Sequence, residues 1–105
     1  MAWIWVFCAG LLEIAWAVGL KVSDGFRRPV VSAFTVIGMI LSFVLLSQGM
    51  RRLPAGTAYA VWTGIGSAGT ALIGMWLLGE PRGTARLACL ALIIAGILGL
   101  RLSGD

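Results

Sequence analysis

The first long apolar stretch of the chain, residues 2–20, has a glutamate well inside it, Glu13, and no other charged residue. As a helix, this stretch spans about 27–30 Å, the thickness of the hydrocarbon core of a bilayer. A charged side chain placed there costs at least about 2.5 kcal/mol. Membrane proteins keep such groups mainly to bind an ion or move a proton, so Glu13 is the first candidate functional residue. A protonated glutamate with a purely structural role is the alternative.

Short clusters of charged residues divide the chain into four apolar segments, at about residues 2–20, 30–50, 56–78 and 86–101. Hydrophobic residues make up 60% of the sequence and charged residues 11%, whereas soluble domains are about 45–50% apolar. Each segment approaches the length that a membrane-crossing helix needs, and lipid favours helices because the backbone must satisfy its own hydrogen bonds. We therefore predict one all-α transmembrane domain of four helices over residues 1–105, with the first span retained rather than cleaved as a signal peptide.

The net charge of +4 does not indicate nucleic-acid binding, because the basic residues are scattered over short loops and form no continuous face. They are better explained as anchors at the membrane interface. Cys8 and Cys89 lie inside predicted spans without metal-ligand spacing, and the chain has no histidine. We expect both cysteines to be buried apolar residues and expect no metal, haem or other cofactor.

The distribution of Lys and Arg gives only a weak orientation signal. Four spans place three basic residues on the side of the N-terminus and five on the other: Arg51, Arg52 and Arg101 against Lys21, Arg27, Arg28, Arg82 and Arg86. By the positive-inside rule, so small a difference permits insertion in both orientations. Four helices are also too few to surround a polar pathway. We therefore expect an antiparallel, dual-topology homodimer in which two Glu13 side chains approach one central cavity near the midplane.

The fourth segment carries a stripe of small residues, Ala91, Ala95 and Gly99, which recur every four positions. Small residues at this spacing let two membrane helices approach closely, so the stripe is a candidate dimer contact. Packing within one copy of the chain explains the same pattern equally well.

Two residues beside Glu13 on the first helix suggest a slot for a planar cation. Gly10 removes bulk one turn before the carboxyl group, and Trp16 lies one turn after it. A cation in such a slot can pair with the carboxylate and stack on the indole face. A lipid-facing or packing role is the alternative for Trp16.

The third segment supplies further candidates for the site. Tyr59 and Trp62 share one helix face with Gly66, and the Tyr59 hydroxyl can reach a carboxylate while its ring contacts a cation. Gly64 and Gly66 weaken the helix and permit a hinge, although close helix packing explains them as well. In the second segment, the hydroxyl of Ser42 could orient a carboxylate or bond the carbonyl four residues earlier on its own helix.

Four motifs together give the chain a resemblance to a known family. They are LLEIAWAVGLK (11–21), SDGF (23–26), LPAGTAYAVWTGIGSAG (53–69) and GEP (79–81). With the size and the four spans, this pattern resembles the small multidrug resistance family over the whole chain. The resemblance implies an antiparallel dimer that exports cations across the inner membrane in exchange for protons.

The resemblance also implies a subtype. Guanidinium exporters of this family have Trp three residues after the first-helix glutamate, the position of Trp16 in this chain. Exporters of polyaromatic cations have a small residue there. Ser42 and the Glu-Pro pair after the third span also resemble the guanidinium exporters, while Gly79 stands where those often have Lys. By this resemblance Glu13 binds substrate and proton, Gly10 gives it room, and four residues line the site: Trp16, Ser42, Tyr59 and Trp62.

Competition at one carboxyl group gives a mechanism for such a protein. Removal from water favours the protonated form of Glu13, and a second copy of the group nearby couples the two titrations. Protons and a small cation then compete for the same oxygens, and a proton gradient drives export. Export of quaternary ammonium or polyaromatic cations is the main alternative. A cation channel and a structural subunit are others, and an enzyme is not expected because no nucleophile–base pair is evident.

Overall fold

The computed structural model describes residues 2–103, and it contains four helices and no strand within them. The helices are α1 (Ala2–Val22), α2 (Pro29–Gly49), α3 (Ala55–Leu77) and α4 (Thr84–Leu102). Each is long and apolar enough to cross a bilayer, since 19–23 residues extend about 29–35 Å. The predicted all-α class, with four helices able to span a bilayer, is therefore confirmed, and the antiparallel dimer stays a prediction. Residues 1, 104 and 105 of the predicted domain lie outside the described part.

The helix ends follow from local turn chemistry. α1 runs to Val22, two residues beyond the predicted span, and the hydroxyl of Ser23 then donates to the carbonyl of Leu20 at 2.8 Å. Asp24 and Phe26 have φ angles of 53° and 66°, a left-handed conformation that cannot continue the helix. Pro29 stands in the first turn of α2, where its missing N–H costs nothing.

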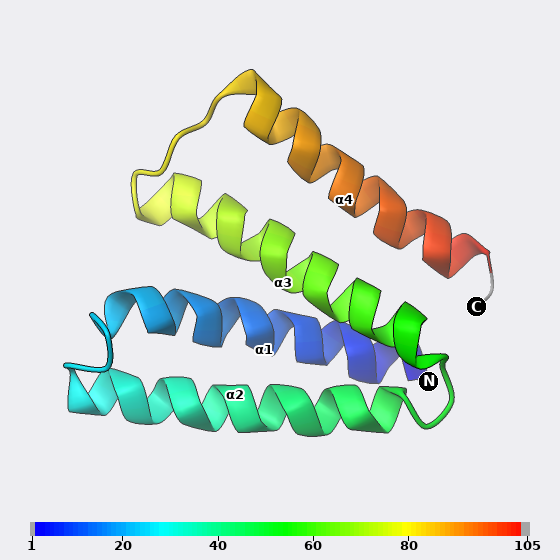
Figure 1. The fold of residues 1–105 in the computed structure, drawn as a ribbon, viewed down its shortest axis with the longest axis horizontal. Coiled ribbons are helices and arrows are strands. Elements are labelled where there is room, and N and C mark those ends of the chain that lie inside the picture. The colour runs from blue at the N-terminus through cyan, green and yellow to red at the C-terminus, as the bar shows by residue number, and fades with distance from the viewer. Residues whose placement is uncertain (1, 104–105) are drawn as a thin grey trace.

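The four helices form a flat layer rather than a closed bundle (Figure 1). Their order across the layer is α2, α1, α3, α4, and the molecule measures 41 × 34 × 16 Å. Within the described residues, α1 packs against both α2 and α3, whereas α4 packs mainly against α3 and reaches α1 at its end, where Arg101 lies over the ring of Trp3 at 5.2 Å. A layer about one and a half helix diameters thick cannot enclose a polar pathway by itself.

The core lies where α1, α2 and α3 meet. Its buried apolar residues are Val6, Ala9, Leu46, Ala58, Val61 and Trp62. Close approach is possible because Gly49 leaves no side chain where Val6 of α1 packs against α2. The part between α3 and α4 is smaller and has Ala68, Met75 and Leu90 as its buried residues. Many large apolar side chains remain on the outside, as expected for a protein surrounded by lipid.

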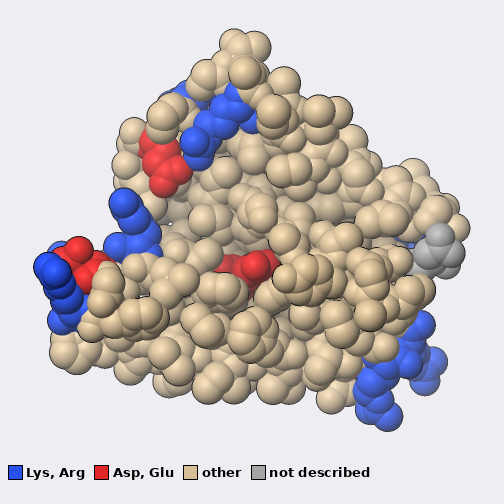
Figure 2. Space-filling view, in the orientation of Figure 1, with Lys and Arg blue, Asp and Glu red and all other residues tan. Residues whose placement is uncertain are grey.

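The charged side chains mark the two ends of the layer. Figure 2 shows Lys and Arg at both ends and an almost uncharged surface between them. Such charges at the ends of membrane spans are typical of interfacial anchors. Because basic residues lie at both ends, the structure has the distribution on which the dual-topology prediction was based.

Candidate functional site

Glu13 lies within α1, partly exposed, with its carboxyl group against α3. Gly66 of α3 provides the space, because a Cβ atom there would collide with Glu13 Oε1. Within residues 2–103, Glu13 is the one acidic residue inside a helix, and its buried Oε1 has no hydrogen-bond partner. Figure 2 shows acidic atoms in the middle of the face, between the charged ends. A carboxyl oxygen in this position is available to a proton or a cation.

A cavity of about 340 Å³ adjoins this carboxyl group. Its lining residues come from α1, α3 and the α3–α4 loop: Glu13, Ala17, Gly66, Ser67, Thr70, Ala71, Glu80 and Arg86. The hydroxyl of Thr70 is buried there and has no partner among the described residues. The cavity has room for a small cation, and hydroxyl and carboxylate oxygens are suitable acceptors for its N–H groups.

Ser42 joins three helices through its hydroxyl group. Ser42 Oγ donates to the carbonyl of Ala9 on α1 at 2.7 Å and accepts a hydrogen bond from Trp62 Nε1 on α3 at 2.9 Å. Both bonds are buried. The alternative in which Ser42 bonds its own helix at the preceding turn is therefore wrong for this structure, because a better-placed carbonyl is offered by α1.

Aromatic rings surround this hydrogen-bonded pair. Phe43 lies between two tryptophans, with its ring centroid 6.3 Å from that of Trp16 and 5.7 Å from that of Trp62. Tyr59 lies 5.4 Å from Trp62 and is 56% exposed. The sequence analysis did not select Phe43, although its position directly after Ser42 was a usable signal. The rings form one aromatic wall, to which α1, α2 and α3 all contribute.

The predicted lining residues thus fall into two groups in the single chain. Ser42, Tyr59 and Trp62 belong to the aromatic wall, and Trp16 joins them through Phe43. Glu13 instead points to α3, and no hydrogen bond joins it to any of these four residues within the described chain. The indole N–H of Trp16 is buried without a partner there, so it too is available to a ligand. The joint lining of one substrate site by both groups stays a prediction.

The glycines near Glu13 are occupied by packing contacts. Ile65 of α3 fills the space above Gly10, and Ile97 of α4 lies 2.9 Å from the point where a Cβ on Gly64 would stand. The room at Glu13 therefore comes from Gly66 across the interface, which the sequence analysis considered only as a hinge or packing residue. α3 is continuous through Gly64 and Gly66. A hinge at these two residues stays a prediction.

The predicted dimer stripe on α4 lies on the surface of the single chain. Ala91, Ala95 and Gly99 are all exposed, and no atom lies within 4 Å of a Cβ built on Gly99. Ile93 and Ile97 face α3 from the opposite side of the helix. The stripe is therefore exposed in one described copy, and its role in a dimer stays a prediction.

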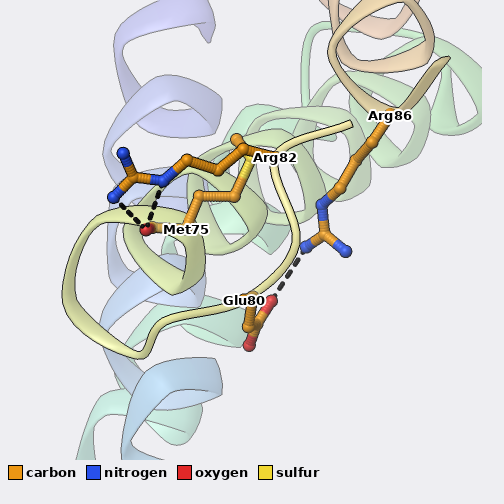
Figure 3. Close-up of polar contacts among 4 residues, drawn as sticks. All are labelled: Met75, Glu80, Arg82 and Arg86. Carbon is orange, nitrogen blue, oxygen red and sulfur yellow. Dashed lines mark hydrogen bonds and ion pairs between the residues drawn. The ribbon is translucent and has the colours of Figure 1, made fainter. Parts of the chain in front are cut away.

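Two arginines close the end of α3 (Figure 3). Arg82 donates from Nε and Nη2 to the carbonyl of Met75, at 3.1 and 2.7 Å, and so satisfies one of the last carbonyls of the helix. Arg86 at the start of α4 pairs with Glu80 at 2.8 Å. The sequence analysis used Glu80 and Arg86 only as loop markers. Glu80 was nevertheless detectable as one of four acidic residues in the whole chain.

A model of the family described as Small Multidrug Resistance protein matches residues 1–93. The chain belongs to the small multidrug resistance family. It is 56% identical over 103 residues to the guanidinium exporter of Citrobacter freundii, a match that covers 98% of both chains. The guanidinium exporter of Yersinia pseudotuberculosis serotype I (strain IP32953) is also 56% identical, over 98% of this chain and 99% of its own. That of Salmonella typhimurium (strain LT2) is 55% identical over the same length.

These matches confirm the family resemblance and cover nearly the whole of this small multidrug resistance protein. The names of the family and of the relatives indicate a membrane transporter. With four helices that are able to span a bilayer, the chain is a multi-pass protein of the inner membrane.

Proposed function

We propose that this protein is a proton-coupled antiporter that exports guanidinium and small guanidinyl cations. The observation that carries the proposal is the carboxyl group of Glu13, which lies inside a span with one buried oxygen unpartnered and a cavity beside it. Such a group needs a proton or a cation to offset its removal from water. Relatives with 56% identity that are named guanidinium exporters support the choice of cation.

Guanidinium suits the groups near Glu13 in shape and charge. It is planar and carries N–H donors on every edge, so a carboxylate can receive two parallel hydrogen bonds from it. Trp16, one turn from Glu13, offers an indole face on which such a plane can stack. Tetraalkylammonium ions have no N–H donors, so the carboxylate attracts them by charge alone. The preferred substrates are therefore guanidinium and its singly substituted relatives.

The working unit in this proposal is an antiparallel homodimer. A layer 16 Å thick leaves Glu13 partly exposed, and a second copy would cover it and bring a second Glu13 into the same site. The exposed stripe Ala91, Ala95 and Gly99 is the proposed contact between copies. Weak charge bias between the two ends is compatible with opposite orientations of the two copies.

In this proposal the two Glu13 carboxyl groups bind either protons or guanidinium, but not both at once, and transport follows from this competition. A guanidinium ion that reaches deprotonated Glu13 binds, and protons that arrive from the acidic side displace it there. If the dimer changes orientation only when it holds protons or the cation, a proton gradient drives net export. The exchange requires no nucleotide and no metal ion.

The test is transport by the purified protein in liposomes with a pH gradient. Guanidinium should move in the direction opposite to the proton flux, and its transport should saturate. The apparent affinity for guanidinium should fall as the pH is lowered, because protons occupy Glu13. Proton-coupled transport of a bulky quaternary cation, without transport of guanidinium, would instead establish the alternative substrate class. Current that passes without proton exchange would establish a channel.

A further inference from the structure

The cavity beside Glu13 contains a second carboxylate at its other end. Glu80, in the α3–α4 loop, lines the same cavity of about 340 Å³ together with Arg86. The backbone N–H of Glu80 donates to the carbonyl of Gly74 at 3.1 Å, which fixes the residue over the last turns of α3. Its carboxyl carbon lies 2.5 Å from the point where a Cβ on Gly74 would stand. Only glycine leaves room for this position of the carboxylate.

The two carboxylates lie along one stripe of α3, formed by Gly66, Thr70 and Gly74. Glu13 rests on Gly66, and Glu80 rests on Gly74. Eight residues of helix separate these two glycines, a distance of about 12 Å. The unpartnered hydroxyl of Thr70 lies between them and lines the same cavity. Oxygen acceptors therefore follow the stripe from the loop to the middle of the membrane.

The partner of Glu80 is the guanidinium group of Arg86, which has the same hydrogen-bonding groups as the proposed substrate. Arg86 Nη2 contacts Glu80 Oε1 at 2.8 Å, and no second hydrogen bond makes the pair bidentate (Figure 3). Arg86 Nε is buried without a partner among the described residues. The side chains of Arg86 and Glu80 are 34% and 37% exposed. A single-contact pair that water can reach is weak and opens readily.

We propose that Glu80 is an outer binding site for the guanidinium substrate and that Arg86 occupies this site as a tethered competitor. A free guanidinium ion can replace the Arg86 head group on Glu80 and form the two parallel bonds that Arg86 does not make. It then reaches Glu13 along the Gly66–Thr70–Gly74 stripe. This inference rests on the proposed export of guanidinium. In an antiparallel dimer, one such outer site would stand at each face of the membrane.

The experiment measures the KM and maximal rate of guanidinium transport in proteoliposomes for the wild type, E80Q, R86Q and the double variant. E80Q should raise KM by roughly two- to fivefold, the range that exposed ion pairs support. R86Q should lower KM, because it removes the competitor from Glu80. The double variant should resemble E80Q, because Arg86 acts through Glu80. Maximal rates should change little, since the later steps at Glu13 are intact.

Arg82 provides the matched control for charge. It is a loop arginine that contacts the Met75 carbonyl and not Glu80, so R82Q removes one positive charge without releasing the carboxylate. If R82Q lowers KM as much as R86Q does, the effect is one of general charge and the outer site is refuted. If E80Q leaves KM unchanged while the wild type transports guanidinium, the outer site alone is refuted. Absence of guanidinium transport by the wild type refutes the proposed function and this inference with it.

Discussion

The interface between α1 and α3 and the interface between α3 and α4 are built differently. The first contains the core, the Glu13 carboxyl on Gly66 and, with α2, the buried Ser42–Trp62 bond. The second buries few residues, and α4 contributes only Leu90 to them. α1, α2 and α3 thus satisfy each other within one copy, whereas α4 leaves most of its surface open.

This difference fits separate roles for the two regions in the proposed dimer. A polar group such as Ser42 needs defined partners in lipid, and the three-helix part supplies them. α4 carries no such group within its apolar stretch and presents small residues outward, as a helix does that meets another helix. In the proposal, the three-helix part therefore holds the site and α4 joins the copies. The four predictions below test this division, from the largest expected effect to the smallest.

Glu13→Gln should abolish proton-coupled transport, because it preserves the shape of the side chain but removes the group that binds protons. Guanidinium binding should no longer release protons, which a pH-sensitive dye can measure in weakly buffered detergent solution. Asp24→Asn is the control, since it removes a carboxylate from the α1–α2 turn and Asn tolerates the φ angle of 53° at that position. If guanidinium uptake driven by a pH gradient persists in Glu13→Gln, Glu13 is not part of the mechanism.

Gly99→Leu should separate the copies of the protein while the three-helix part stays folded. A Cβ atom at position 99 meets no atom within 4 Å in a single copy, so the substitution should disturb the contact between copies rather than the fold of one copy. Crosslinking yield and transport should both fall strongly, because the proposed site needs two Glu13 side chains. Gly56→Leu is the control, because Gly56 of α3 is equally open. A Gly99→Leu protein that remains dimeric and active would show that the small residues of α4 do not form the contact between copies.

The sequence predicted the helices because apolar length and charge clusters alone determine them, and lipid permits little else. The Glu13 site was predicted in part for the same reason, since a carboxyl group in a span is visible without coordinates. The partner surfaces were not predicted. That Gly66 rather than Gly10 faces the carboxyl group depends on the rotation of α1 against α3, which single-helix periodicity does not define.

Polar contacts between distant residues were beyond the sequence for a related reason. Ser42 had an available carbonyl on its own helix, and only the approach of α1 makes Ala9 the partner. Likewise, Glu80 and Glu13 are far apart in the chain, and they share a cavity because Gly74 and Gly66 lie on one stripe of α3. The stripe itself was recognisable as a small-residue pattern, but its occupants were not.

Gly66→Ala tests the contact between α1 and α3 at Glu13. The added methyl group would collide with Glu13 Oε1, so the carboxyl group must turn or the helices must separate. Overpacking of this kind costs about 1–3 kcal/mol, and guanidinium affinity should fall with it. Gly56→Ala is the matched control on the same helix, because its methyl group meets nothing. The affinity for guanidinium can be measured by titration, with tryptophan fluorescence as the signal. Equal affinities of the two variants would mean that the Glu13 carboxyl group does not lie against Gly66 in the working protein.

Ser42→Ala comes last of the four, because its expected cost does not exceed that of Gly66→Ala: it removes one hydroxyl and leaves the packing nearly unchanged. The Trp62 indole N–H and the Ala9 carbonyl would both lose their partner, at a cost of about 1–3 kcal/mol to the folded state. Denaturant unfolding should report this loss, and Trp62→Phe with the double variant completes the cycle. Because the indole acts through Ser42, the two substitutions should be less than additive. Fully additive losses would show that the Ser42–Trp62 bond is absent in the membrane, and that α2 and α3 are held by packing alone.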